Sequence, residues 1–274
     1  MAVRLDQYLS KPLTDLRYQP VPKRVRAALG EQAVVRTDRA VLVWEPRRVV
    51  PDYAVPEADM QVELSPDEGE PATERRAIRW SAGGPPVLDP RVPFRVHTAE
   101  GDSLLLRADG QQAAAFRPSD PELAGYVVLE FGALQWWEED EPIVGHPRDP
   151  FHRIDVRRSS RWVRLEDQGV VLADSDRPRL LFEAAFPMPR YYLPRKDVRV
   201  RLRPGTARTT SAYQGHATHW TADLGDRELP DIAWSYEHPL SDAVEVGGMV
   251  CFYQEKLDLF VEGERVERPV TPWS

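Results

Sequence analysis

Two stretches of this sequence resemble each other along their whole length. Residues 23–64 read KRVRAALGEQAVVRTDRAVLVWEPRRVVPDYAVPEADMQVEL, and residues 161–202 read RWVRLEDQGVVLADSDRPRLLFEAAFPMPRYYLPRKDVRVRL. They align without gaps, 138 positions apart, and the identical residues include Glu45 and Glu183, Tyr53 and Tyr191, and Asp59 and Asp197. Self-similarity over such a length indicates two diverged copies of one domain.

The similarity continues in the same order beyond these stretches. AIRW at 77–80 corresponds to ATHW at 217–220, and GYVVLEFGAL at 125–134 corresponds to GMVCFYQEKL at 248–257. The first copy is longer, and its extra length falls around the Gly/Pro-rich loop SAGGPPVLDPRVPF at 81–94. We therefore predict a first domain over 18–146, a connection over 147–160 and a second domain over 161–274.

The local pattern of both copies is typical of short strands. In DVRVRL, for example, Val198, Val200 and Leu202 alternate with charged residues, as on a strand with one buried face. Clusters such as GTARTTS and EGERVE read as turns, and the chain has 26 prolines, which suit strands and turns better than long helices. We expect a mostly β protein made of antiparallel sheets.

Composition limits the classes of protein to consider. The 274 residues are enough for two modest domains, and no stretch reaches the roughly 18 apolar residues that span a bilayer. The net charge of −8 argues against general nucleic-acid binding, which needs a basic face. The amino-terminal MAVRLDQYLSKPL lacks the apolar core of a signal peptide, so we expect a cytoplasmic protein without nucleic-acid or membrane partners. The oligomeric state stays open.

The single cysteine, Cys251, excludes an internal disulfide and any zinc site made of several thiolates. Because it lies in the apolar run GGMVCFYQ, we interpret it as a small buried hydrophobe rather than a nucleophile. We expect no metal and no cofactor.

Several separated motifs of the second copy carry a family resemblance. These motifs are RSSRWVRL, RLLFEAAFPMPRYYLPRKDV, AYQGHATHW, IAWSYEHP and LFVEGERVERPVTPWS. The chain resembles the bacterial family named domain of unknown function 427 (DUF427), whose tandem form also carries the phrase found here as HPRDPFHRIDVRRSSR. The resemblance implies two tandem β-tent-like domains of coiled antiparallel sheets, similar to Mss4-like proteins and related by a pseudo-two-fold axis.

One motif departs from the family pattern. The family commonly has Cys-Pro-aromatic-Lys-Gly where this chain has Ser211, Ala212, Tyr213, Gln214 and Gly215. Loss of the lysine removes an obvious reactive amine. The first copy has Thr-Glu-Arg-Arg at 73–76 and keeps few aromatic residues apart from Trp80 and Phe116, so we expect it to serve as a scaffold.

The second copy also concentrates aromatic and polar residues that could line a ligand pocket. Trp234 and Tyr236 are two apart and would share one face of a strand. Together with Tyr213 and Trp220 they could form an aromatic box, although hydrophobic core is the competing interpretation. The expected ligand-binding set is Tyr192, Tyr213, Gln214, His216, Trp220, Trp234 and Tyr236.

The two histidines of HATHW need separate treatment. On a strand, His216 and His219 would point to opposite faces and could not easily share a metal. In an enzyme, His216 would act as general acid or base and Tyr213 as a hydrogen-bond donor.

Three hypotheses for the function follow. The leading one is a small-molecule-binding protein with its pocket in or beside the second copy. The alternatives are an enzyme that uses the same pocket, and a structural or interaction module whose aromatic residues are all core. Nucleotidyl transfer would need paired carboxylates on a strand, and we interpret the nearest candidates, Asp223 and the acidic residues of 138–141, as solvated turns.

Overall fold

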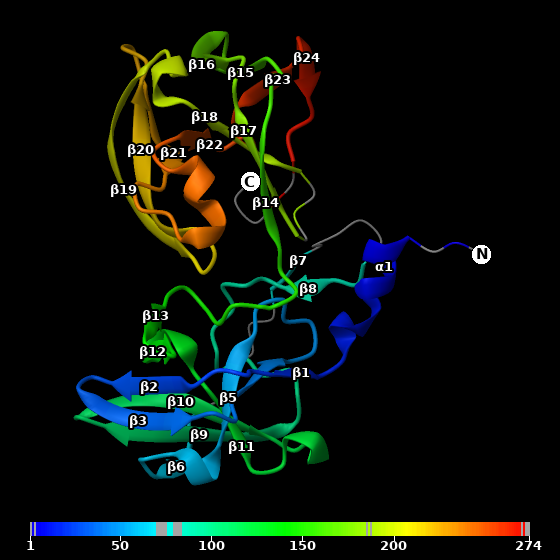
Figure 1. Cartoon of the computed structure of the whole chain (residues 1–274), viewed down its shortest axis with the longest axis vertical. Helices are drawn as coiled ribbons and strands as arrows, with labels where there is room; N and C mark the ends of the chain where they lie inside the picture. Colours follow the sequence, from blue (N-terminus) through cyan, green and yellow to red (C-terminus); the bar gives the residue numbers. More distant parts are fainter. Residues whose placement is uncertain are drawn as a thin grey trace. The chain divides into compact units, whose positions relative to one another are not determined.

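A computed structural model of the chain describes residues 2, 4–69, 76–78, 84–184, 186, 188–269 and 271. The chain forms two compact units, Met1–Asp149 and Pro150–Ser274. Strands in antiparallel sheets make up most of the regular structure of both units (Figure 1). The prediction of a mostly β protein is confirmed.

Two antiparallel sheets form most of the described part of the first unit. The larger contains, in spatial order, β1 (Arg17–Pro20), β4 (Val41–Trp44), β5 (Asp52–Pro56), β11 (Tyr126–Leu129), β10 (Gln111–Pro118), β9 (Gly101–Ala108) and β6 (Leu64–Pro66). The smaller contains β13 (Glu141–Ile143), β12 (Gln135–Glu138), β2 (Val25–Leu29) and β3 (Gln32–Thr37). Its short helices are α1 (Leu5–Leu9) and the 3-10 helices η1 (Lys11–Thr14), η2 (Glu57–Asp59), η3 (Pro121–Leu123) and η4 (Phe131–Ala133).

The second unit is built in the same way. Its larger sheet contains β14 (Ile154–Arg158), β17 (Arg179–Glu183), β18 (Arg190–Leu193), β22 (Val250–Phe252), β21 (Glu228–Ser235), β20 (Gly215–Asp223) and β19 (Arg201–Ser211). Its smaller sheet contains β16 (Val170–Ser175), β15 (Val163–Asp167), β23 (Asp258–Val261) and β24 (Glu264–Val266). The 3-10 helices are η5 (Arg195–Asp197) and η6 (Ser241–Val246).

The two units share one strand order. When β7 and β8, which form a separate sheet in the first unit, are left out of the count, numbering the strands from the start of each unit gives the same order in the large sheets and the same order in the small sheets. A register shift falls between Ala27 and Ala28 in β2, and another falls between Leu165 and Glu166 in β15, 138 positions later. Agreement at the level of a bulge is more specific than agreement of fold class, because bulges depend on local sequence.

The same polar contact joins a strand to a 3-10 helix in both units. It lies between the end of β3 and η2 in the first unit, and between the end of β16 and η5 in the second. A hydroxyl donates to an aspartate, and an arginine pairs with the same carboxylate, both at distances of 2.6–2.7 Å. The residues are Thr37, Arg39 and Asp59 in the first unit and Ser175, Arg177 and Asp197 in the second. Each residue is again 138 positions from its counterpart.

Each large sheet buries both of its faces. Alternating side chains such as Leu42, Tyr53 and Leu106 pack in a cluster with residues of the small sheet, which explains the period of two in the sequence. On the other face, Val43, Phe116 and Leu123 form a second, smaller cluster in the first unit. Trp234, Tyr192 and Val246 belong to its counterpart in the second unit.

One part of the proposed sequence correspondence is wrong. Ala77 and Ile78 form β7, which pairs with β8 (Val87–Leu88) in a separate two-stranded sheet, whereas ATHW lies in β20 of the large sheet. The strand equivalent to β20 is β9, and by register Leu104 takes the place of Trp220, because both pair with an alanine of the next strand. A four-letter match with two identities could not define a register. Trp80 and residues 73–75 lie outside the described residues.

Part of the predicted connection is regular structure. Ile154–Arg158 form β14 and pair with β17 at the edge of the large sheet of the second unit. Val156 is buried and its charged neighbours are exposed or half-buried, so this segment has the alternation of a strand with one buried face. Among the described residues, no helix is long and apolar enough to cross a membrane.

Candidate functional site

One face of the large sheet of the second unit carries a row of polar and aromatic side chains. Tyr192 on β18 and Trp234 on β21 both lie opposite Cys251 of the strand between them, and His219 on β20 lies opposite Trp234. Cross-strand neighbours project from the same face of a sheet. This row therefore crosses four strands, and all four side chains are buried.

A chain of hydrogen bonds runs from this row toward the surface. Trp234 Nε1 donates to the Tyr192 hydroxyl at 3.2 Å, and the Tyr192 hydroxyl donates to Gln214 Oε1 at 2.8 Å. Gln214 Nε2 in turn lies 3.5 Å from Glu183 Oε2, a long contact at the end of β17. Polar groups taken out of water need such partners, because an unpaired one costs roughly 1–3 kcal/mol.

The outer end of the chain is a carboxylate–imidazole pair. His152 Nε2 lies 3.0 Å from Glu183 Oε1, and the His152 ring stacks on Tyr213 with centroids 4.3 Å apart. The side chains of His152 and Glu183 are 16% and 15% exposed, so both reach solvent while remaining largely enclosed. A carboxylate that bonds one imidazole nitrogen fixes the orientation of the ring.

Gln214 and Tyr213 lie in the turn between β19 and β20. Ser211 Oγ accepts from the backbone N–H groups of Tyr213 and Gln214 at 3.2 and 3.1 Å, which closes the turn. Gly215 has φ of +98°, in the left-handed region that suits glycine. This turn brings the side chain of Gln214 inward, next to Glu183.

Burial controls the protonation of the row. It raises the pKa of the Tyr192 hydroxyl well above its ordinary value, with Cys251 and Tyr236 adding to the effect. Burial likewise raises the pKa of the Cys251 thiol and that of the Tyr236 hydroxyl. All three groups are therefore neutral at physiological pH. The interpretation of Cys251 as a buried hydrophobe is confirmed by its full enclosure.

A buried ion pair borders the row. Arg190 donates from both terminal nitrogens to Glu255, at 2.9 and 2.6 Å, and its guanidinium lies 5.5 Å from the Trp234 ring. Burial alone would raise the pKa of Glu255, but the hydrogen bonds and charge of Arg190 hold it below its usual range. The Trp234 ring also lies near Tyr253, whose centroid is 4.6 Å away. Trp234 is therefore packed on several sides.

Five of the seven predicted ligand-binding residues are brought together: Tyr192, Tyr213, Gln214, Trp234 and Tyr236. Trp220 is not among them, because it pairs with Ala233 and so faces the other side of the sheet from Trp234. There, Trp220 Nε1 donates to Ser235 Oγ at 2.8 Å and Arg195 covers the indole at 4.1 Å. The expected four-membered aromatic box is not formed.

His216 and His219 lie on opposite faces of β20, as the strand pattern predicts. His216 is exposed and its Nδ1 lies 2.9 Å from Thr210 Oγ1, so it faces away from the hydrogen-bond chain. His219 is buried, with Nε2 2.8 Å from Thr209 Oγ1, and burial lowers its pKa. His216 is thus poorly placed for acid–base work on a ligand held by Gln214 and Tyr192.

Sequence reasoning missed His152 and Glu183. A signal existed for Glu183, since it is one of the identical positions of the repeat, paired with Glu45. No local pattern marked His152, which lies outside regular strands and reaches Glu183 across 31 positions.

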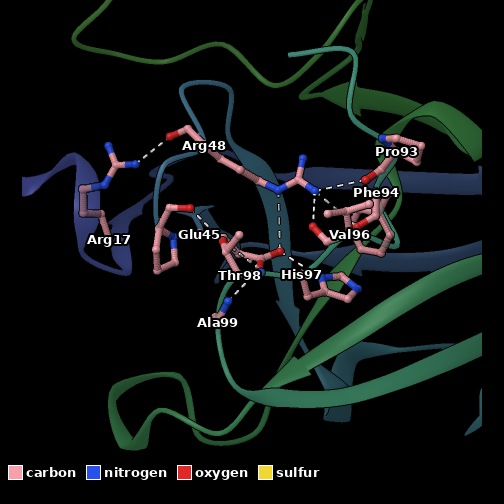
Figure 2. A network of polar contacts seen from close by, with 10 residues as sticks. Arg17, Glu45, Arg48, Pro93, Phe94, Val96, His97, Thr98 and Ala99 are labelled. Atoms are coloured by element: carbon pink, nitrogen blue, oxygen red, sulfur yellow. Dashed lines mark hydrogen bonds and ion pairs between the residues drawn. The ribbon is translucent and has the colours of Figure 1, made fainter. Parts of the chain in front are cut away.

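In the first unit, the residue equivalent to Glu183 is Glu45, and Figure 2 shows its polar contacts. Glu45 Oε2 accepts from the backbone N–H groups of Thr98 and Ala99 at 2.6 and 3.0 Å, and Glu45 Oε1 lies 2.9 Å from His97 Nδ1. Arg48 donates to the carbonyls of Pro93 and Val96 in the same loop. Two side chains that follow β4 therefore hold residues 93–99.

This loop covers the residue equivalent to Trp234. By register Phe116 occupies that position, since it pairs with Val128 as Trp234 pairs with Cys251. The His97 ring stacks on Phe116 with centroids 3.8 Å apart and an interplanar angle of 11°. In the first unit, the loop over residues 93–99 therefore lies on this face of the large sheet, where the second unit has its row of hydrogen-bonded side chains.

The carboxylates considered for nucleotidyl transfer do not form a metal site. Contrary to expectation, Glu138 is buried, accepts from the Tyr53 hydroxyl at 2.8 Å and pairs with Lys23. Asp223 lies on β20 and caps the backbone N–H of Gly225. Within the described ranges, no three His, Cys, Asp or Glu side chains are grouped to hold a metal ion.

Comparison with known families concerns the second unit. Residues 155–263 match the family model described as domain of unknown function (DUF427). The second unit thus resembles DUF427 domains. The DUF427 match begins within β14 and ends before β24, so it includes Glu183, Tyr192, Gln214 and Trp234 but not His152. A search of curated proteins found no match to the chain.

Proposed function

We propose that this protein binds a small molecule at the outer end of the hydrogen-bond chain in its second unit. The observation that carries the proposal is the continuous path from Trp234 through Tyr192 and Gln214 to Glu183. A scaffold alone could fill this space with apolar side chains, as most of the second cluster of the first unit does. Ligand sites combine apolar and aromatic walls with a few polar groups that fix the orientation of the ligand, and Tyr213, Gln214 and Glu183 supply both kinds of group here.

The contrast between the units supports placing the ligand in the second. Glu45 is 6% exposed, and the loop that it holds already supplies two N–H donors and an imidazole. Glu183 is more accessible and its contact with Gln214 is long, so it keeps acceptor capacity for a ligand donor. The ligand would accordingly carry a hydrogen-bond donor for Glu183 and a flat surface for Tyr213.

An enzyme using the same site is the second candidate, and one observation favours it. The Glu183–His152 pair has the geometry of a base held by an orienting group. His152, rather than His216, would then be the general acid or base. The third candidate, a structural or interaction module, draws support from the close packing of Trp234 and Tyr236.

We also propose that the first unit is a diverged second copy of the DUF427 domain. The shared strand order, the shared bulge and the repeated Asp–Arg–hydroxyl contact support this duplication. A cytoplasmic location and a bacterial source remain expectations that cell fractionation and related sequences would test.

A thermal-shift screen of metabolites on the full chain tests the binding proposal. A ligand present at 100 times its dissociation constant stabilises the folded state by about 2.7 kcal/mol. Hits should weaken at least tenfold on Glu183→Gln and His152→Ala, because both changes remove groups at the outer end of the chain. His216→Ala is the matched control, since that histidine is exposed and bonded elsewhere.

Two outcomes separate the candidates. If a hit is chemically converted and His152→Gln abolishes conversion but not binding, the enzyme proposal replaces simple binding. If hits lose affinity on Phe116→Ala while Glu183→Gln and His152→Ala leave them unchanged, the site belongs to the first unit and our assignment is wrong.

A further inference from the structure

The small sheet of the first unit has a depression on its outer face. Its volume is about 310 Å³, and Arg26, Arg36 and Trp137 line it together with the small side chains of Ala28 and Ala33. Pockets that hold small ligands begin at about this size. The depression involves neither Glu183 nor His152, so it is independent of the function proposed above.

Three of the lining residues form one cross-strand row. Trp137 lies opposite Arg26, and Arg26 lies opposite Arg36. Two like charges directly opposite each other on neighbouring strands destabilise a sheet. The charge of Arg26 is partly balanced, because its guanidinium lies 3.3 Å from the Asp140 carboxylate and donates to the carbonyl of Glu139 at 2.7 Å. Arg36 is exposed and forms no ion pair with any described residue.

The second unit has different residues in the equivalent cross-strand row. The equivalent residues are Phe260, Arg164 and Asp174, so the second arginine is replaced by an acid. Asp174 Oδ1 accepts from Trp162 Nε1 at 2.7 Å, and Arg164 pairs with Glu166. The second unit thus supplies both an indole ring and carboxylates from its own chain at this face.

Different residues stand at these positions in the first unit, where Arg26 has Asp140 as its acidic partner. Arg24 stands where the second unit has Trp162, and its side chain turns toward Asp38 and Glu139, each 3.8 Å away. Ala28 stands where the second unit has Glu166. The indole of Trp162 and the carboxylates of Glu166 and Asp174 thus have no counterpart at the equivalent positions of the first unit, and the depression lies where those side chains would be.

We propose that this depression binds a small planar molecule that carries one anionic group. The anion, a carboxylate or a phosphate, lies between the guanidinium groups of Arg26 and Arg36, which match such groups in shape and charge. The ring lies against the indole of Trp137, over Ala28 and Ala33. The chemistry repeats the internal arrangement of the second unit, where an indole and an acid meet above an arginine.

The test is a titration of the ¹⁵N-labelled full chain, followed by the indole N–H signal of Trp137. Phenyl phosphate and benzoate are the probes, and inorganic phosphate and benzyl alcohol are the comparators. We expect saturable shifts with at least one probe, at an affinity at least tenfold above that of both comparators. Comparison of the two probes distinguishes a phosphate ligand from a carboxylate ligand.

Arg36→Asp introduces the residue found in the second unit and should lower probe affinity at least tenfold. Arg36→Gln is the milder variant if Arg36→Asp does not fold, as judged by the dispersion of the spectrum. Arg201→Gln is the matched control, because Arg201 is an exposed arginine on an edge strand of the second unit, and it should leave probe affinity unchanged.

Three results would overturn the proposal. Equal affinity for inorganic phosphate and phenyl phosphate would remove the role of the ring. Equal affinity for benzyl alcohol and benzoate, unaffected by Arg36→Asp, would reduce the site to an apolar patch. No saturable shift of the Trp137 signal with either probe would show that the face binds no such molecule.

Discussion

Asp52 lies at the first position of β5, where burial raises the pKa of its carboxyl group to about 7. The charges of Glu45 and Glu130 add to this effect, and the charge of Arg48 opposes it. In the unfolded chain the pKa returns to its ordinary value near 4. The folded state therefore holds this proton more tightly than the unfolded state does.

This difference predicts how stability depends on pH. Below about pH 4 the carboxyl is protonated in both states, and between pH 4 and 7 only the unfolded state ionises, so stability falls as pH rises. Asp52→Asn removes this dependence and should raise the free energy of unfolding at pH 8 by on the order of 1–3 kcal/mol, with little change at pH 4. Denaturant unfolding at both pH values measures it.

Asp38→Asn is the matched control, because the Asp38 side chain is 81% exposed. Its effect should be small and the same at both pH values. An Asp52→Asn effect of equal size at pH 4 and pH 8 would contradict the raised pKa.

At the scale of elements, residues 93–99 are held by two side chains that follow β4. Glu45 accepts from the amides of Thr98 and Ala99, and Arg48 donates to carbonyls at the other end of the loop. A buried carboxylate that accepts several N–H groups fixes backbone that has no strand partner. The order of this loop therefore depends on Glu45 at one end and on Arg48 at the other.

Glu45→Gln places an amide N–H₂ among these donors and should loosen the loop. We expect a loss of about 1–3 kcal/mol in unfolding free energy and faster hydrogen exchange at the amides of Thr98 and Ala99. Glu57→Gln serves as the control, since Glu57 pairs with Arg117 near the surface and does not contact this loop. Unchanged exchange at residues 98 and 99 in Glu45→Gln would show that other contacts hold the loop.

At the scale of the whole molecule, the two units have separate sheets and separate cores. The core clusters of the second unit draw only on residues from Ile154 to Val261, and its sheets use only strands β14 to β24. A region with its own core and complete strand pairing has what a domain needs to fold alone.

Residues 150–274 should therefore fold as an isolated fragment. We expect a dispersed amide spectrum that overlays on the signals of the same residues in the full chain, and a single cooperative thermal transition. A fragment with collapsed amide dispersion would show that the second unit needs the first to reach its structure. The fragment 161–274, which lacks β14 and His152, should be less stable because it loses an edge strand of the large sheet.

Local sequence patterns were enough to align 23–64 with 161–202 and to indicate short strands in both stretches. Alternation is a local signal, and it correctly indicated that Val198, Val200 and Leu202 all pack against the core of the second unit. The expected strand over DVRVRL is only partly formed, because β19 begins at Arg201 and Val198 makes an isolated bridge with Ala173. The same alternation placed His216 and His219 on opposite faces of β20. Abundant proline and the lack of long helical patterns also indicated the mostly β class.

Contacts between distant parts of the chain set which of these side chains meet. The contact of His152 with Glu183 joins residues 31 positions apart, and that of Arg190 with Glu255 joins residues 65 apart. The face of Trp220 depends on its pairing with Ala233, next to a register shift between Trp220 and Ala222. A shift of one residue turns every side chain of a strand to the other face, so short motif matches such as AIRW and ATHW carry no information about partners across a sheet.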